Sequence, residues 1–309
     1  MTALPHFDAD AIRDVVDMGT AIQALTEAFK DLGELHPRTQ VSLGVTDDLL
    51  LMPAVTPLGI GIKTVTVMSE NPAKNLPLIH AHYLLCDRET GRPQATFDGS
   101  ALTSLRTPAA SGVATEVLAR AEITSLGIFG TGVQAQGHID AMLSVRPNIE
   151  TIFICGRTFE ASTQFVNNAN GYGRNLVTAS PEDTAEADVL CGCTSSTTPV
   201  IPTSSVQNGA HINLVGSYSA ARREVDIDLV TAASVFVDER EAAENEAGEL
   251  IHADASKQWS FDSVVGDLSD LCLGKVTRGS QEEITLFKSV GLAVEDVVVA
   301  AAVWAAHTN

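Results

Sequence analysis

Hydrophobic and polar positions change their spacing several times along the chain. Apolar residues in 11–33 recur every three or four positions, which predicts an amphipathic helix. Residues 41–97 instead contain short apolar runs, broken at Asn71-Pro72 and at Gly91-Arg92-Pro93. Such runs predict strands, so this part is expected to form a sheet of hairpins. The small-residue segment 101–119 is predicted to be a helix leading into the rest of the chain.

Strand-like and helix-like segments then alternate. Strands are expected at 123–129, 149–155, 188–193, 211–215 and 234–238, and helices at 133–143, 158–170, 181–187 and 229–233. This alternation is typical of a parallel sheet with helices on its faces. The apolar tail, 284–304, is predicted to be a helix that packs back on the first domain. The predicted fold class is therefore α/β, with a Rossmann-type domain over 119–287. A second α+β domain would combine 1–118 with 288–309.

Composition narrows the possible partners and location. The chain has 309 residues, 45% of them hydrophobic, and a net charge of −20, as expected of a globular and strongly acidic protein. Nucleic acids and anionic membranes need clustered Lys and Arg, so neither is an expected partner. No apolar run reaches the roughly 18 residues that cross a bilayer, and no signal-peptide pattern opens the sequence. We therefore expect a cytoplasmic protein with reduced cysteines. No metal site is predicted, because Cys191-Gly192-Cys193 lacks a second pair.

The clearest motif joins a predicted strand to a predicted helix. It reads Gly130-Thr131-Gly132-Val133-Gln134-Ala135, a G-x-G-x-x-A pattern directly after the strand at 123–129. Gly130 permits a tight turn, Gly132 lets the backbone approach a pyrophosphate, and Ala135 lets the helix lie close to the strand. The helix N-terminus adds N–H groups and a partial positive charge. We therefore predict that residues 130–134 bind a nicotinamide dinucleotide. The alternative is a Rossmann-like unit that binds another nucleotide or none.

The end of the next predicted strand bears on the choice between NAD and NADP. An acidic residue there bonds the ribose 2′-hydroxyl of NAD, whereas an arginine accommodates the 2′-phosphate of NADP. This chain has Arg157 and Thr158 at that place, and no acid before Glu160. Arg157 can bond a phosphate with two N–H groups, and Thr158 can add a hydroxyl. NADP(H) is therefore the preferred cofactor, with NAD(H) as the alternative.

Basic residues in the first half are candidates for holding an anionic substrate, because the chain has 19 Lys and Arg against 39 Asp and Glu. Lys63 stands within a run of Ile and Val, where a charge without a partner is costly. Arg106 lies among small residues ahead of the dinucleotide motif, and Arg38 follows a proline. His80 and His82 share one face of a strand and are interpreted as hydrogen-bonded structural groups.

Further short motifs are spread over nearly the whole chain. In order they are Gly61-Ile62-Lys63, Asn71-Pro72, Asp87-x-x-Thr90-Gly91-x-Pro93, Leu102-Thr103-x-x-Arg106-Thr107, the glycine-rich motif, His211-Ile212-Asn213-Leu214-Val215-Gly216-Ser217, Val237-Asp238 and residues 285–296. Together they identify the chain as similar to the ornithine cyclodeaminase/mu-crystallin family. The resemblance implies an NAD(P)-dependent enzyme acting on amino acids or cyclic imino acids. It also implies a homodimer formed through the domain that lacks the dinucleotide motif.

The resemblance also assigns roles to individual residues. Arg38, Lys63 and Arg106 correspond to the family's substrate site, and we assign catalytic roles to Lys63 and Arg106. The family's cofactor site is lined at the positions Thr194, Ser217 and Ser289.

One position departs from the family pattern. Family members that deaminate ornithine or alanine carry an aspartate acid/base shortly after the segment that ends at Gly216, and this chain has Tyr218 there. Tyrosine, with an ordinary pKa of about 10, is a poor base at neutral pH. The departure favours the family's imine reductases over its cyclodeaminases.

The predicted function is therefore reduction of a small cyclic imine carboxylate, such as pyrroline- or piperideine-2-carboxylate. A hydride from NAD(P)H would reach the carbon of the C=N bond. Arg106 and Arg38 would bond the substrate carboxylate, and Lys63 would bond it or give a proton. Two alternatives stay open: oxidative deamination or cyclodeamination of a small amino acid, and a non-catalytic NADPH-dependent ligand-binding protein.

Overall fold

The computed structural model describes residues 4–169, 172–216 and 219–308. The chain forms two compact units: unit 1 comprises Met1–Arg106 with Leu292–Asn309, and unit 2 comprises Thr107–Gly291. Helix α3 (Gly99–Leu118) contains the first of the two boundaries. Within the described ranges, no helix combines the length and apolar character that crossing a membrane requires.

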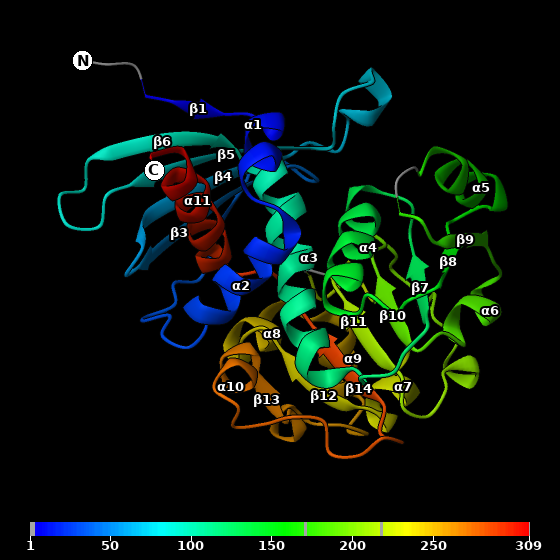
Figure 1. Cartoon of the computed structure of the whole chain (residues 1–309). Coiled ribbons are helices and arrows are strands. Elements are labelled where there is room, and N and C mark those ends of the chain that lie inside the picture. The colour runs from blue at the N-terminus through cyan, green and yellow to red at the C-terminus, as the bar shows by residue number, and fades with distance from the viewer. Residues whose placement is uncertain (1–3, 170–171, 217–218, 309) are drawn as a thin grey trace. The chain divides into compact units, whose positions relative to one another are not determined.

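Unit 1 is built on a six-stranded sheet in the order β1-β6-β5-β4-β3-β2 (Figure 1). Strands β2 to β6 pair antiparallel, and β1 pairs parallel with β6, so the predicted hairpins are confirmed. The strands are β1 (His6–Phe7), β2 (Thr39–Ser42), β3 (Asp48–Thr56), β4 (Gly59–Val67), β5 (Ile79–Cys86) and β6 (Pro93–Asp98). The helices are α1 (Ala9–Val15), α2 (Met18–Ala28), the short 3₁₀ helix η1 (Pro72–Lys74), the start of α3, and α11 (Ala293–Thr308).

The sheet of unit 1 buries one face. Met52, Lys63, Tyr83 and Phe97 are neighbours across β3, β4, β5 and β6, and each side chain is at most 3% exposed. Helix α11 packs on β3, β4 and β5, and it also contacts α1 and α2. Because side chains alternate between the two faces of a strand, Lys63 is directed into this core, where its charge needs partners within unit 1.

Two predicted helices in this unit were wrong in extent. The single helix at 11–33 is two helices, because Val16 is extended and Asp17 caps α2 by accepting from the Thr20 N–H at 2.8 Å. The helix at 284–304 begins only at Ala293. Residues 285–288 instead form a buried strand of unit 2, β14. A short apolar run fits a buried strand as well as a buried helix, so its pattern could not separate them.

Unit 2 holds an eight-stranded, wholly parallel sheet in the order β13-β12-β14-β11-β10-β7-β8-β9. The strands are β7 (Ser125–Phe129), β8 (Thr151–Cys155), β9 (Asn175–Thr178), β10 (Val189–Gly192), β11 (His211–Leu214), β12 (Ser234–Val237), β13 (Gly266–Asp267) and β14 (Thr285–Lys288). The sheet is of the doubly wound Rossmann type, so the predicted fold class is confirmed.

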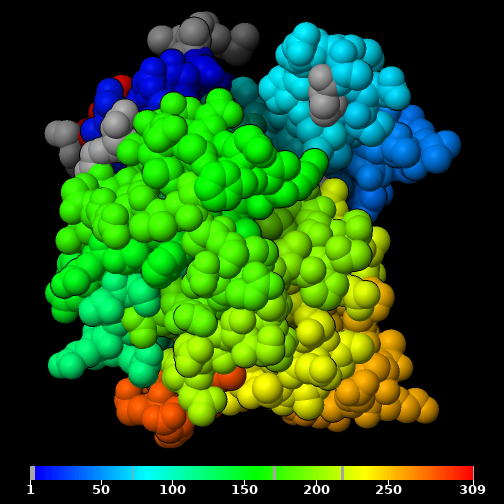
Figure 2. All heavy atoms as spheres, turned by 90° about the vertical axis from the view of Figure 1, so that its right-hand side faces the viewer, coloured from blue at the N-terminus to red at the C-terminus, as the bar shows by residue number. Residues whose placement is uncertain are grey.

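Helices connect the strands of unit 2. They are α4 (Val133–Val145), α5 (Phe159–Asn168), α6 (Pro181–Ala185), α7 (Ile227–Ala232), α8 (Arg240–Glu246), α9 (Gly248–Ala255) and α10 (Leu268–Cys272), with 3₁₀ turns η2 (Thr203–Ser205) and η3 (Phe261–Ser263). Figure 2 looks onto the side of unit 2 formed by α5 and α6 (green). Chain order runs outward from β7 through β8 to β9 and then returns to β10 beside β7. In such sheets, ligands bind at the carboxyl ends of the strands where the order reverses, here between β7 and β10.

Candidate active site

The glycine-rich turn follows β7, as predicted. Gly130 has a φ of +116°, and a Cβ there would lie 2.6 Å from the carbonyl oxygen of Cys193, so a larger residue would be both strained and obstructed. The Gly130 N–H donates to the Cys155 carbonyl at 2.8 Å, which ties the turn to the end of β8. The turn therefore lies at the carboxyl edge of the sheet, beside the switch point between β7 and β10.

Gly132 leaves open space at the start of helix α4. It is the N-cap residue, and among the residues that the structure describes no side chain caps the helix there and no atom lies within 4 Å of where a Cβ would be. The next side chain, Val133, is 68% exposed. An uncapped helix N-terminus with room in front of it fits a pyrophosphate, which accepts N–H bonds and is attracted by the positive end of the helix. Gly130 to Gln134 could therefore hold the phosphates of a dinucleotide.

Arg157 lies at the same edge of the sheet, after β8, and its side chain is exposed. A Cβ on the preceding Gly156 would come 2.8 Å from Cγ2 of Thr131, so the turn after β8 packs closely on the phosphate turn. Thr158 is the N-cap of α5, and its hydroxyl accepts from the Ala161 N–H at 3.2 Å. An exposed guanidinium beside the phosphate turn is suited to a 2′-phosphate, whereas Thr158 already caps a helix.

The other predicted cofactor residues have different surroundings. Thr194, just after β10, is half-buried, and its hydroxyl accepts from the Ser196 N–H at 3.2 Å. Ser289 is 2% exposed and donates to Asp238 at 2.9 Å. Asp238 also accepts from the N–H groups of Val290 and Gly291, so Ser289 belongs to a buried turn after β14.

Two predicted positions, Ser217 and Tyr218, lie outside the described residues. Cofactor roles for Ser217, Thr194 and Ser289 stay predictions.

Lys63 forms a buried ion pair with the first turn of α11. Its Nζ lies 2.9 Å from Oδ1 and 2.7 Å from Oδ2 of Asp296, and it donates to the Thr103 hydroxyl at 3.2 Å. Lys63 is 2% exposed and Asp296 is fully buried. Burial lowers the pKa of Lys63 to about 8, with a contribution from the Arg106 charge, while Asp296 opposes the shift. The ammonium group is thus mostly protonated at neutral pH and can give up its proton slightly above it.

Arg106 pairs with Glu295, the neighbour of Asp296 in the first turn of α11. Its Nη1 donates to Oε2 of Glu295 at 2.7 Å, and its Nε lies 3.6 Å from Oδ1 of Asp296. Arg106 is 6% exposed, and Glu295 is fully buried. Lys63, Arg106, Glu295 and Asp296, which we call the four-charge cluster, therefore carry no net formal charge. Carboxylates in the first turn of a helix are also favoured by its dipole.

The structure thus brings together the two residues predicted to be catalytic and adds two acids with no predicted role. Glu295 and Asp296 stand in the quoted segment 285–296, but their pairing with residues 189 and 233 positions away is a tertiary contact. The sequence signal that could have revealed them is the presence of two adjacent acids at the start of an apolar helix, because buried charges need partners.

Tyr83 is the cross-strand neighbour of Lys63 and lies at the edge of the cluster. Its side chain is 1% exposed, and a Cβ on Gly61 would come 1.7 Å from the phenolic oxygen, so the ring lies over that glycine. Burial raises the pKa of Tyr83 well above its usual value, and the charge of Asp296 adds to the rise. Tyr83 is therefore neutral and cannot act as a base at physiological pH.

Arg38 lies two strands from Lys63 at adjacent register. It immediately precedes Thr39, whose partner on β3 is Leu51, and Leu51 pairs in turn with Thr64. Its side chain is half-buried. The strand pairing therefore places Arg38 level with Lys63 across the sheet. Its substrate role stays a prediction.

The two predicted structural histidines lie on β5 and are exposed. His82 stacks on the ring of His6 with 5.6 Å between centroids, a contact between strands that fits a structural role.

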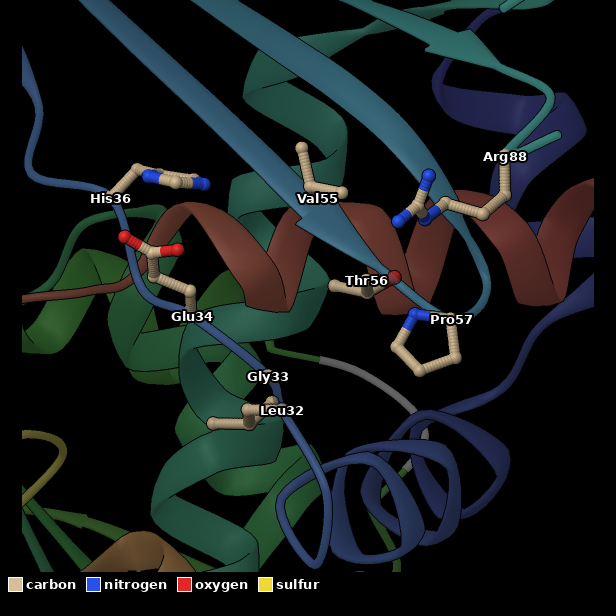
Figure 3. A pocket seen from close by; sticks show the side chains of 8 residues that line it. All are labelled: Leu32, Gly33, Glu34, His36, Val55, Thr56, Pro57 and Arg88. Atoms are coloured by element: carbon tan, nitrogen blue, oxygen red, sulfur yellow. The ribbon is translucent and has the colours of Figure 1, made fainter. Parts of the chain in front are cut away.

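A cavity of about 340 Å³ lies elsewhere in unit 1 (Figure 3). Its walls come from the end of β3, the segment after α2 and the turn after β5, and its lining residues are Leu32, Gly33, Glu34, His36, Val55, Thr56, Pro57 and Arg88. None of the predicted site residues that the structure describes lines it.

The family follows from comparison with known proteins. The profile of the ornithine cyclodeaminase/mu-crystallin family matches residues 8–308. The chain belongs to this family. It is 35% identical over 304 residues to a Delta(1)-pyrroline-2-carboxylate reductase of Bacillus thuringiensis subsp. konkukian, covering 94% of this chain and 93% of that relative. The resemblance predicted from the motifs is confirmed.

Two solved structures match nearly the whole chain. The Thermococcus litoralis Delta(1)-pyrroline-2-carboxylate reductase in complex with NADH and L-proline has a TM-score of 0.94 and 30% identity, covering 99% of this chain and 98% of that one. An archaeal alanine dehydrogenase dimer with bound NAD has a TM-score of 0.93 and 30% identity, covering 99% and 96%. These matches agree with the predicted fold class.

Proposed function

We propose that this chain is an NAD(P)H-dependent reductase of a small cyclic imine carboxylate, forming the corresponding cyclic amino acid. It is an oxidoreductase that acts on carbon–nitrogen bonds. The observation that carries the proposal is the buried Lys63–Asp296 pair beside Arg106, which supplies a titratable ammonium and a guanidinium in one place. Similarity to pyrroline-2-carboxylate reductases supports the substrate class.

The residues of unit 2 would hold the cofactor. The backbone of Gly130 to Gln134 would bind its pyrophosphate, and the ends of β10 and β11 would carry its nicotinamide half. When bound, reduced nicotinamide supplies the hydride that the imine carbon accepts. The open space at Gly132 and the uncapped start of α4 support this arrangement.

The residues of unit 1 would manage the substrate's charges. Lys63 would hold a proton at Nζ for the imine nitrogen, and its pKa of about 8 is close to neutral pH, which suits a general acid. Arg106 would bond the carboxylate, because its planar fork matches that group and Glu295 fixes its orientation. We also propose that unit 1 is the substrate-binding domain and unit 2 the dinucleotide-binding domain.

A substrate panel tests the proposal. NADPH and NADH oxidation should be measured with five- and six-membered cyclic imine carboxylates, and the reverse reaction with proline, alanine and ornithine. We expect turnover of the cyclic imines. Turnover of open-chain amino acids with NAD(P)⁺, and none of cyclic imines, would contradict the proposal and favour the second candidate. That candidate is an amino-acid dehydrogenase, and similarity to an archaeal alanine dehydrogenase supports it. Tight NADPH binding without turnover of any substrate would indicate a binding protein.

We further propose that NADP(H) is preferred over NAD(H), on the strength of the exposed Arg157 beside the phosphate turn. Arg157→Asp should weaken NADPH binding by about tenfold or more, because a charge-assisted hydrogen bond contributes roughly 1.5–3 kcal/mol. NADH binding should change little. Arg88→Asp, at an exposed site in unit 1 with the same change of charge, is the matched control. Calorimetry with both dinucleotides measures the effect, and equal losses with both would remove Arg157 from the 2′-phosphate site.

Apolar side chains on the face of the unit 1 sheet opposite Lys63 support a homodimer. Ile62 and Leu84 are paired across β4 and β5 on the face opposite Lys63, and they remain half-buried in a single chain. Val41 and Leu43, on and just after the edge strand β2, are 42% and 51% exposed. We propose that a second copy covers this apolar face. A sedimentation mass equal to one chain would contradict a dimer.

A further inference from the structure

A buried carboxylate lies between the ends of two central strands of unit 2. Glu224 is fully buried, and it lies in the segment between β11 and α7. Its Oε1 accepts from the Thr194 N–H at 2.6 Å, just beyond β10. Its Oε2 accepts from the Gly216 N–H at 2.9 Å, just beyond β11. One side chain therefore joins the two loops that leave the carboxyl ends of β10 and β11.

The surrounding backbone is shaped to admit this carboxylate. A Cβ on Gly192, the last residue of β10, would lie 2.9 Å from Cδ of Glu224. A Cβ on Gly216 would lie 2.6 Å from Oε1 of Glu224 and 1.8 Å from the Thr194 carbonyl oxygen. Because both positions would clash with any larger residue, the strand ends approach each other closely around the Glu224 side chain.

A second acid and a lysine lie behind Glu224. Its own N–H donates to Oε1 of Glu249 at 3.0 Å, and Lys288 lies 3.4 Å from Oε2 of Glu249. The side chains of Lys288 and Glu249 are fully buried, and the Lys288 charge also acts on Glu224. The Glu224 charge also contributes to the raised pKa values of the Cys191 and Cys193 thiols, for which burial is the larger cause.

Burial raises the pKa of Glu224 to about 7, and the Glu249 charge adds to the rise. Lys288 and the hydrogen bonds from Thr194 oppose it.

The position of the Glu224 side chain relates it to the cofactor, on the basis of the function proposed above. The phosphate turn belongs to β7, and Arg157, on the 2′-phosphate side, follows β8, so the adenosine half is assigned to that side of the switch point. The nicotinamide half then falls on the β10 and β11 side. Thr194 directly follows Cys193, whose carbonyl lies against Gly130 of the phosphate turn. The loops that Glu224 holds are therefore those expected beneath the nicotinamide half.

We propose that Glu224 is a positioning residue for the nicotinamide half of the dinucleotide, acting through the backbones of Thr194 and Gly216 as long as its carboxylate is ionised. An ionised carboxylate accepts hydrogen bonds at both oxygens, whereas protonation turns one oxygen into a donor that faces an N–H. One of the two loops then loses its anchor. Dinucleotide affinity is consequently full above the pKa of Glu224 and declines as pH falls through it.

The experiment measures dinucleotide affinity without substrate on both sides of pH 7. NADH is the probe, because it lacks the 2′-phosphate, a monoester that titrates near pH 6 itself. Wild-type affinity should fall as the pH drops through about 7, the pKa of Glu224. Glu224→Gln has the same shape but presents an NH₂ group to one of the two N–H donors. It should bind NADH about tenfold more weakly at alkaline pH, as expected for losing a hydrogen bond to a charged group, and its affinity should not change with pH in this range.

Glu249→Gln is the second variant, and it keeps the carboxylate of Glu224. Removing the neighbouring negative charge lowers the pKa of Glu224, so the loss of affinity should move to lower pH while alkaline affinity is retained. This variant tests the proposal even if Glu224→Gln does not fold.

Several results would overturn the inference. One is the same pH dependence of NADH affinity in wild type and in Glu224→Gln. Another is a loss of NADH affinity that occurs at the same pH in Glu249→Gln as in wild type. A third is a Glu224→Gln protein with a lower melting temperature but unchanged NADH affinity at every pH, which would indicate a purely structural role. Failure of the wild type to bind any dinucleotide would instead overturn the proposed function itself.

Discussion

Replacing Lys63 with methionine should lower kcat for imine reduction by about 10²- to 10⁴-fold, the usual contribution of a general acid. Methionine fills similar space in the buried row of the sheet but cannot hold a proton. Dinucleotide binding should be unchanged, because Lys63 belongs to unit 1 and the glycine-rich turn to unit 2. Steady-state kinetics and calorimetry separate the two effects. A kcat within a few fold of wild type would remove Lys63 from the reaction.

The partner of Lys63 supplies the control for folding. Lys63→Met alone leaves Asp296 buried without its ammonium, and an uncompensated buried charge costs about 3–5 kcal/mol. Lys63→Met with Asp296→Asn removes both charges and should recover much of that stability without recovering kcat. If the double variant regained activity along with stability, the loss in Lys63→Met would be a folding effect.

The pH dependence of reduction provides a further check on the same residue. As a general acid, Lys63 works only when protonated, so activity should fall as the pH rises through about 8. Asp296 raises the pKa of Lys63, so Asp296→Asn should move this alkaline limb to lower pH. Comparing the two proteins on one substrate cancels the titration of the substrate itself. An alkaline limb at the same pH in both would contradict the role of the pair.

Replacing Gly132 with alanine should weaken dinucleotide binding by about 100-fold but lower the melting temperature only slightly, by the small cost of alanine at an N-cap. The φ of Gly132 is −92°, which alanine adopts without strain, and its Cβ would meet no atom of the described part of the chain within 4 Å. The methyl group would instead occupy the space in front of α4 where the pyrophosphate must approach. The loss corresponds to one or two charge-assisted hydrogen bonds at roughly 1.5–3 kcal/mol each.

Two other glycines provide contrasting controls. Gly44→Ala also places its Cβ in open space, in unit 1, and should change neither stability nor binding. Gly130→Ala should lower stability as well as binding, because its φ is +116° and its Cβ would lie 2.6 Å from a backbone oxygen. Thermal melting and calorimetry on the three variants make the comparison. Undiminished affinity in Gly132→Ala would mean that the dinucleotide does not approach this turn.

Local patterns were sufficient for much of the fold. The alternation of strands and helices after residue 123 predicted the parallel sheet, because each element buries an apolar face and its apolar residues therefore recur at a regular spacing in the sequence. The glycine-rich turn was also readable, since backbone approach and positive φ demand glycine wherever they occur. The motifs in between were enough to identify the family.

Other features depended on contacts between distant residues. The strand at 285–288 has an apolar run that also suits a helix, and only its place between β11 and β12 decides the matter. Val16 and Asp17 end one helix and start another through a cap that the apolar spacing concealed.

The chemistry of the site divides in the same way. By itself the sequence determined which residues carry charge in apolar surroundings, and Lys63 and Arg106 were found on that basis. Only the tertiary structure decided that α11 brings Glu295 and Asp296 onto them, and that Glu224 joins the ends of β10 and β11. The physical reason is that the local sequence around a charge in an apolar segment shows that the charge needs a partner, whereas the identity of that partner depends on how the elements pack.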